Sequence, residues 1–218
     1  MYKIDLHTHS TGSPDGGITT SQYKQVLEDG LLDYIAITDH NRVDMALRLN
    51  KELGERIIVG EEIMTSKGEI IGLFLQTIVP PNLTPIETVQ RIRDQGGLVY
   101  VPHPFEIIRK GLRAADLEDI AELIDIMEVY NGRAILRDRS QQAAVWAKLN
   151  RVIGVASSDA HGVKGLGKTY TLAPEAPTRD NLLTLLTTST SIASRPSLRE
   201  LMYPKYHRLR QKSQRGKV

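Results

Sequence analysis

The chain of 218 residues has no cysteine, few aromatic residues and no long apolar run. Without cysteine it can form neither a disulfide nor a thiolate metal site, so His, Asp and Glu must hold any bound metal ion. Structural zinc sites usually contain thiolate ligands. Because this chain has no thiolates, a bound metal ion is more consistent with an open catalytic site. No window contains the roughly 18 consecutive apolar residues of a membrane helix. Polar residues follow Met1 at once, so we expect no signal peptide and a cytoplasmic protein.

The composition is otherwise that of an average globular protein, with 40% apolar and 25% charged residues. The length suits one α/β barrel. Residues 204–218 carry six Lys or Arg residues and no acid, and removing these from the net charge of +2 leaves −4 for residues 1–203. We therefore expect one domain over residues 1–203 and a basic tail over residues 204–218. The tail could attract nucleic acid, but a solvated terminus is the favoured interpretation because it carries few aromatic residues.

Strand-like and helix-like segments alternate along the chain. The strand-like segments are short and rich in β-branched or aromatic residues, whereas the helix-like ones end at Gly or begin with a capping pattern such as Thr84-Pro85-Ile86-Glu87. The expected strands are 2–6, 33–38, 56–59, 69–77, 98–102, 124–130, 151–156 and 191–194, and the expected helices are 21–29, 41–53, 84–95, 116–123, 134–149 and 179–187. Repeated strand–helix units predict a parallel sheet, as a barrel or a doubly wound sheet.

Five of the six histidines lie in six short segments that are rich in metal-ligand side chains. Imidazole and carboxylate groups suit zinc, manganese and iron, and histidines scattered for solubility would not collect in this way. Alone, a His-x-His or a His-Pro pair would be weak; their joint occurrence predicts a metal cluster. The segments that contain them are Asp5-Leu6-His7-Thr8-His9, Asp15, Thr38-Asp39-His40, Gly60-Glu61-Glu62, His103-Pro104 and Ser158-Asp159-Ala160-His161.

The candidate ligands follow the carboxyl ends of predicted strands. In a parallel barrel these ends form one face, where active sites are built, so ligands more than a hundred residues apart can converge there. Residues i and i+2 just past a strand point the same way, which lets His7 and His9 reach one ion. Asp159 and His161 repeat this spacing after a later strand.

These motifs, with the Ser-Pro-Asp15-Gly turn, resemble the polymerase and histidinol phosphatase (PHP) superfamily in order, from about residue 3 to about residue 172. The resemblance implies an irregular (β/α)₇ barrel with two or three divalent metal ions at the carboxyl ends of the strands. Members of this superfamily are mostly metal-dependent phosphoesterases.

The resemblance also implies a role for each ligand. His7, His9 and Asp159 would hold the first ion, Glu62 would bridge it to the second, and His103 would bind the second. Asp15, His40 and His161 would form a third position. Glu69 stands where relatives often have a further histidine; it is either a ligand, which would favour manganese over zinc, or a hairpin residue. The ions expected are manganese, zinc or iron.

Paired divalent ions lower the pKa of a bridging water and neutralise charge on phosphoryl oxygens. The expected catalytic groups are Glu62, Asp159 and His161, acting through a metal-bound hydroxide. Cations should bind the remaining phosphate oxygens, with Arg133 and Lys168 as the selected residues. Other loop cations are alternatives, namely Arg109, Lys110 and Lys164. Glu128 and Asn131 should line the same cavity as supporting or substrate contacts.

We therefore expect a hydrolase of phosphomonoesters or phosphodiesters, with a small metabolite, a nucleotide or an oligonucleotide end as substrate and no membrane partner. Two alternatives belong to other classes of protein. One is a non-catalytic, metal-stabilised PHP module, against which the near-complete ligand set argues. The other is a nucleic-acid-binding protein that uses the basic tail, whose binding would depend steeply on salt.

Overall fold

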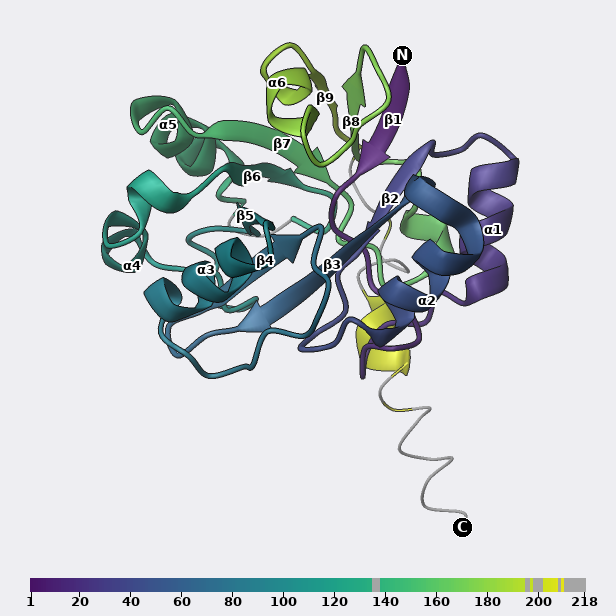
Figure 1. Cartoon of the computed structure of the whole chain (residues 1–218), viewed down its shortest axis with the longest axis horizontal. Coiled ribbons are helices and arrows are strands. Elements are labelled where there is room, and N and C mark those ends of the chain that lie inside the picture. The colour runs from purple at the N-terminus through teal and green to yellow at the C-terminus, as the bar shows by residue number, and fades with distance from the viewer. Residues whose placement is uncertain (135–137, 195–196, 198–201, 208, 210–218) are drawn as a thin grey trace.

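The computed structural model describes residues 1–134, 138–194, 197, 202–207 and 209. Strands and helices alternate through most of the chain (Figure 1). The elements are β1 (Tyr2–Asp5), α1 (Thr20–Glu28), β2 (Tyr34–Ile37), α2 (Asp44–Leu53), η1 (Gly54–Arg56), β3 (Ile57–Met64), β4 (Glu69–Leu73), α3 (Pro85–Asp94), β5 (Leu98–Val101), α4 (Ala114–Glu118), η2 (Ala121–Leu123), β6 (Ile126–Asn131), α5 (Ser140–Leu149), β7 (Ile153–Ser157), η3 (Val163–Gly165), β8 (Tyr170–Ala173), α6 (Leu182–Thr187) and β9 (Thr190–Ile192).

The strands form one sheet in the order β7-β6-β5-β4-β3-β2-β1-β8-β9. Strands β1 to β3 are parallel, as are β5 to β7, and β4 runs antiparallel between these two groups. The sheet curls until β7 lies against β8, where the Thr171 hydroxyl donates to the Ala156 carbonyl at 3.0 Å. Just past β1 and β7, Thr8 pairs directly with Ala160. The result is a nearly closed barrel whose parallel strands end at one rim.

Local sequence signals explain where several helices begin. Thr84 accepts a hydrogen bond from the amide of Glu87, whose side chain reaches back to the Thr84 amide, and Pro85 occupies the first turn. Thr19 and Gln22 form the same reciprocal cap at the start of α1. Each box satisfies amides that a helix start leaves unpaired. Helix α3 begins at Pro85 as its capping pattern predicts, and α1 begins at Thr20, one residue before the predicted helix 21–29.

The alternation of apolar residues along the strands produces two cores. In β2, Ile35 and Ile37 pack outward under the surrounding helices, whereas Ala36 faces the barrel interior. In β5, Tyr100 points inward and is fully buried. The leucines of α6 join the interior cluster, and this helix lies beside the start of β1, at the end of the barrel away from the rim (Figure 1). Helix α6 thus covers one end of the barrel with apolar side chains, and polar side chains lie at the opposite end.

The barrel class agrees with the prediction, but the strand number differs. The described residues form nine strands instead of seven, because the chain adds antiparallel pairings to the parallel barrel. Strand β8 was not predicted, since its four residues follow a glycine-rich loop without a clear helical partner. Helix α5 begins at Ser140, and residues 135–137 of the predicted helix 134–149 lie outside the described residues.

The predicted boundary between domain and tail falls within a helical segment. Residues 202–207 are helical, and Pro204 is buried against the barrel. The remainder of the predicted tail, residue 208 and residues 210–218, lies outside the described residues. No helix within the described part of the chain has the length and apolar character needed to cross a membrane.

Candidate metal centre

Glu62 lies at the centre of the polar rim, and its two carboxylate oxygens face different imidazoles. Its Oε1 atom is 3.0 Å from Nε2 of His103 and 3.4 Å from Nε2 of His7. Its Oε2 atom is 3.2 Å from Nε2 of His9 and 3.0 Å from Nδ1 of His40. The side chain comes from the barrel strand β3 and is almost completely buried. A carboxylate with a separate set of nitrogen donors on each oxygen has the arrangement needed to bridge two ions.

The first predicted position is a tight group of His7, His9 and Asp159. The Nε2 atoms of the two histidines lie 3.1 Å apart, and Oδ1 of Asp159 lies 3.7 Å and 3.5 Å from them. His7 and His9 follow β1, and Asp159 follows β7, so the direct pairing of those two strand ends brings the three together. Glu62 lies next to this group, 3.4 Å from Nε2 of His7 and 3.2 Å from Nε2 of His9.

A divalent ion fits this donor set. The Nδ1 atom of His7 lies 3.1 Å from Glu128, and that of His9 lies 3.1 Å from Ser13 Oγ. When the outer nitrogen of each ring carries the hydrogen, Nε2 is left as a lone-pair donor turned toward the cavity, as in most metal-ligating histidines. The described residues contain several groups of three such ligands whose donor atoms lie within 4.8 Å of one another.

The charges of this group perturb one another strongly. Burial opposes protonation of His7, yet Glu62, Asp159 and Glu128 raise the pKa of its imidazole well above the ordinary value. Burial likewise disfavours a charged His9, but hydrogen bonds to Asp159 and Glu62 raise its pKa to about 9. The pKa of Asp159 is lowered well below its usual range: burial alone would raise it, and Arg133 and His7 reverse the effect. The carboxylate of Asp159 is therefore kept negatively charged, which favours a cation next to it.

The second predicted position adds Glu69 to His103. Oε2 of Glu69 lies 3.7 Å from Nε2 of His103, and its Oε1 lies 3.6 Å from Nδ1 of His40. Because β4 is antiparallel, its first residue stands at the same rim as the ends of the parallel strands. Burial and the neighbouring charge of Glu62 raise the pKa of Glu69 to about 9. The side chain of Glu69 thus lies among the predicted ligands. This position agrees with the first of its two predicted roles, that of a metal ligand.

The third predicted position lies beside the first. Asp15 is 3.6 Å from Nε2 of His40 and 3.5 Å from Nε2 of His161, measured from its two oxygens. The ring of His161 is 4.1 Å from that of His9, centre to centre. Burial, His9 and Arg133 lower the pKa of His161 to about 3, which keeps this imidazole neutral and able to act as a ligand. All nine predicted ligands thus lie around one cavity or directly beneath it.

Two of these ligands sit on unusual backbone. His103 has φ of 28° and Asp159 has φ of 51°, the left-handed region that residues with a side chain seldom adopt. Such strain costs on the order of 1–3 kcal/mol per residue and persists where the surrounding structure enforces it, most often at functional sites. The strain turns both side chains back over the rim instead of letting the strand continue outward.

A buried network holds the ligands from behind. Besides the contact with His7, Glu128 accepts hydrogen bonds from the backbone amide of His103 at 2.7 Å, from the Tyr100 hydroxyl at 2.9 Å and from Asn131 Nδ2 at 2.8 Å. Glu128 therefore orients ligands of two predicted ions. Sequence reasoning missed Tyr100; its signal was the inward position two residues after Leu98 in a strand of otherwise apolar residues.

Three further buried carboxylates accept hydrogen bonds from loop residues. Asp39 accepts from the amide of Ser10 at 2.7 Å and also from its hydroxyl, which holds the loop after His9. Asp5 accepts from the amide of Ser158 at 3.0 Å, and burial raises its pKa to about 7. Glu61 accepts from the Val79 amide at 2.8 Å and contacts no predicted ligand through a described hydrogen bond.

Two arginines and one lysine differ in their relation to the centre. Arg133 Nη1 lies 3.3 Å from Asp159 and 3.2 Å from Nδ1 of His161. Arg109 Nη1 lies 3.0 Å from the other oxygen of Asp159, and its Nη1 also donates to Asn131. Both arginines line the metal-centre cavity of about 600 Å³. Lys168, the other selected cation, is exposed and lines a neighbouring cavity.

Comparison with known proteins agrees with this architecture. Residues 138–189 match the model of the PHP-associated family. The chain is 38% identical over 144 residues to an uncharacterized protein of Methanocaldococcus jannaschii, covering 59% of this chain and 81% of that one. It is 27% identical over 176 residues to a 5'-3' exoribonuclease of Haemophilus influenzae, covering 76% of this chain and 58% of the relative.

A solved structure shares the fold over nearly the whole chain. It is a two-domain protein from Bacteroides vulgatus that contains a predicted PHP-like metal-dependent phosphoesterase, with a TM-score of 0.67, 18% identity, and coverage of 95% of this chain and 69% of that one. This likeness shows that the two proteins share the barrel fold. The chain belongs to the PHP superfamily.

Proposed function

We propose that the protein is a metal-dependent hydrolase of phosphoric esters. Its substrate would be a phosphomonoester or phosphodiester of a small metabolite, a nucleotide or an oligonucleotide end. The observation that carries this proposal is the position of Glu62 between four imidazoles, with Arg133 and Arg109 next to Asp159 on the same cavity. Divalent ions and a guanidinium together provide the positive charge that a phosphoryl group needs in its transition state.

Different residues of the chain would hold the two ions. His7, His9, Asp159 and Glu62 would hold one ion, and His103, Glu69 and Glu62 the next. Bound there, divalent ions would supply Lewis acidity, lowering the pKa of water and withdrawing charge from phosphoryl oxygens. His161 is neutral at physiological pH because its pKa is about 3, so its imidazole can ligate an ion without first losing a proton.

Arg133 is the residue best placed to bind substrate. Its guanidinium reaches the edge of the predicted first position, and 20% of its side chain is exposed. A phosphate entering the cavity would meet Nη1 of Arg133 and could form a charge-assisted hydrogen bond shorter and stronger than the 3.3 Å contact to Asp159. Arg109 is more tightly held, since Glu106, Asn131 and Asp159 all accept from it, so it would mainly support Asp159.

The experiment is a screen of phosphorylated compounds with protein loaded with manganese, zinc or iron. Hydrolysis should be lost in Glu62→Gln and His7→Ala. The matched control Glu28→Gln changes an exposed carboxylate on α1 and should retain the parent rate. Metal-loaded protein that binds two ions but hydrolyses no ester of either class would instead support the metal-stabilised, non-catalytic module.

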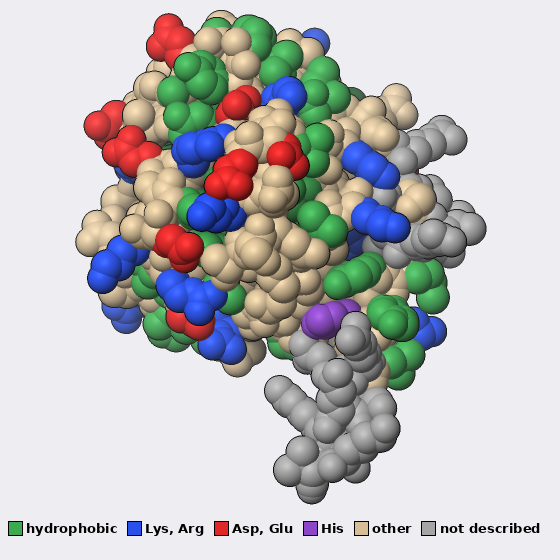
Figure 2. Space-filling model, turned by 90° about the vertical axis from the view of Figure 1, so that its right-hand side faces the viewer, with side chains coloured by type: hydrophobic (Ala, Val, Ile, Leu, Met, Phe, Trp, Pro, Cys, Tyr) green, Lys and Arg blue, Asp and Glu red, His purple; other side chains and the backbone are tan. Residues whose placement is uncertain are grey.

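Nucleic-acid binding through the basic tail is the weaker alternative. On the face that carries α1 and α2, Lys and Arg side chains lie among Asp and Glu side chains in Figure 2. Such mixed charge does not form the continuous basic stripe that tracks a phosphate backbone. Binding of an oligonucleotide that weakens steeply with salt, without hydrolysis, would favour this alternative.

A further inference from the structure

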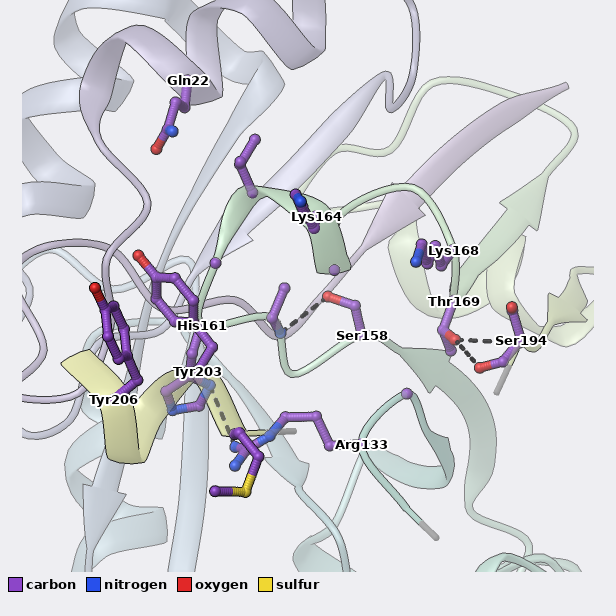
Figure 3. A pocket seen from close by; sticks show the side chains of 16 residues that line it. Gln22, Arg133, Ser158, His161, Lys164, Lys168, Thr169, Ser194, Tyr203 and Tyr206 are labelled. Atoms are coloured by element: carbon purple, nitrogen blue, oxygen red, sulfur yellow. Dashed lines mark hydrogen bonds between the residues drawn. The ribbon is translucent and has the colours of Figure 1, made fainter. Parts of the chain in front are cut away.

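A second cavity of about 620 Å³ adjoins the metal centre. The two cavities share Arg133 and His161, which line both. In Figure 3 these two side chains lie together, joined by the hydrogen bond between Nη1 of Arg133 and Nδ1 of His161. A group attached to a phosphate at the metal centre would therefore pass this pair and enter the second cavity. Its volume is within the range of pockets that hold a whole small-molecule ligand.

One wall of this cavity is the helical segment 202–207. Tyr203 and Tyr206 come from this segment in Figure 3, and Met202 also lines the space. These residues lie beyond the region of family resemblance, and no role in the metal centre accounts for two aromatic rings here. Tyr206 is 60% exposed, so its ring is available to a ligand.

Tyr203 is seated on two glycines of the loops that carry ligands. A Cβ atom at Gly17 would meet the Tyr203 hydroxyl oxygen, and one at Gly162 would lie 3.0 Å from its ring. Gly17 follows the Asp15 turn and Gly162 follows His161, and the Gly17 amide donates to the His161 carbonyl at 2.8 Å. On its other side, the Tyr203 ring stacks on His207 at 5.8 Å with an interplanar angle of 15°. The aromatic wall is thus built onto the metal-binding loops.

The facing wall is cationic and polar. Lys164 and Lys168 lie across from the tyrosines in Figure 3, with Thr169 and Ser194 beside Lys168. Thr169 and Ser194 are joined by hydrogen bonds of 3.3 Å, which fixes the polar edge of the cavity. An occupant suited to these walls has a flat ring for the tyrosines, polar substituents for the rim and negative charge for the lysines.

We propose that this cavity is a specificity subsite for the nucleobase-bearing part of a phosphoester whose phosphate lies at the metal centre. The inference rests on the proposed hydrolase function and names the substrate class within it. Aromatic side chains bind bases of every kind by stacking, because each base presents a π-face. The exposed ring of Tyr206 would receive the base, Tyr203 would form the wall behind it, and Lys164 and Lys168 would receive any further phosphate.

Tyr206 is the residue best suited to a test, because its ring is exposed and can be removed without disturbing the packing of the helical segment 202–207. In Tyr206→Ala, the ratio of kcat/KM for adenosine 5′-monophosphate to kcat/KM for ribose 5-phosphate should fall about tenfold, the scale of one lost base–aromatic contact. Tyr206→Phe keeps the ring and should keep the ratio. Lys205→Ala changes an exposed residue of the same helix that does not line the cavity, and both kinetic values should equal those of the parent.

A binding measurement separates the subsite from the chemistry. Calorimetric titration with adenosine, which has no phosphate to hydrolyse, should show binding to the parent and to Tyr206→Phe and about tenfold weaker binding to Tyr206→Ala. If adenosine binds in this pattern while no phosphoester is hydrolysed, the hydrolase function fails and the subsite stands. If esters are hydrolysed but the ratio is the same in all variants and adenosine does not bind, the subsite proposal is overturned.

The source of the base is resolved by repeating the kinetics with a 5′-phosphorylated dinucleotide. A tenfold loss in Tyr206→Ala with the mononucleotide alone indicates a free nucleotide as substrate. The same loss with the dinucleotide indicates the end of a chain, and either result supports a base in the cavity.

Discussion

Nδ1 of His7 lies 3.1 Å from Oε1 of Glu128, with both side chains completely buried. This contact sets which ring nitrogen of His7 faces the cavity. Glu128 also accepts from the His103 amide, so one carboxylate connects the ligands of two predicted ions. The centre is therefore organised as much by the group behind the ligands as by the ligands themselves.

The first prediction concerns this support. Glu128→Gln should weaken metal binding by about 10- to 100-fold, the usual effect of losing a group that orients a ligand. The replacement removes the negative charge and presents an amide to four donors, which cannot all be satisfied. Affinity is measured by competition with a chelator. Glu118→Gln alters a glutamate that accepts from Trp146 Nε1 at 3.0 Å, away from the site, and an equal loss there would contradict the argument.

The second prediction concerns the number of ions. Glu62→Gln should lower the metal content more than Asp15→Asn or Glu69→Gln does, because Glu62 faces the donors of both central positions. Elemental analysis after metal-supplemented expression, with anomalous scattering from crystals, gives the occupancy of each position. Fewer than two ions in the parent protein would rule out the multinuclear arrangement.

The third prediction distinguishes the two selected cations. Arg133→Ala should lower turnover by about 10²-fold and raise the inhibition constant of inorganic phosphate, because it removes one preorganised charge-assisted donor at the metal centre. Lys168→Ala should have a smaller effect on a simple ester, since Lys168 lines the neighbouring cavity. Arg42→Ala serves as the control, since Arg42 is exposed and pairs only locally with Asp44. If Arg133→Ala has the same kinetics as the parent, another residue must bind the phosphate group.

The fourth prediction concerns pH. In the metal-free protein, His9 with a pKa of about 9 is protonated at neutral pH, and a metal ion can bind its Nε2 only after that proton leaves. Metal affinity should therefore rise with pH up to about 9, and binding at pH 7 should release at least one proton. Manganese titrations in two buffers of different ionisation enthalpy measure this number. The number of protons released should fall above pH 9.5. If metal binding at pH 7 releases no proton, the expected rise of metal affinity with pH is wrong.

Local chemistry explains which parts of the fold could be predicted. The capping box at Thr84 and Glu87 and the alternation in β2 and β5 depend on neighbours in the chain, so helix α3 and the buried strands agree with the prediction to within a residue or two. Residues 69–77 were predicted as a strand, and β4 forms the first part of that range, Glu69–Leu73. Strand β8 was missed because its four residues follow a glycine-rich loop without a clear helical partner, and one of its two neighbours in the sheet, β1, lies about 170 residues earlier.

The sequence by itself determined the family, the barrel class and the set of ligand-bearing segments, since residue type and spacing after each strand carry that chemistry. Only the tertiary structure decided how those side chains share the rim. The antiparallel direction of β4 brings Glu69 beside His103, and the packing of Tyr203 on Gly17 and Gly162 builds a second cavity next to His161. These relationships join residues far apart in the chain, and their geometry arises when the barrel closes and buries its apolar interior.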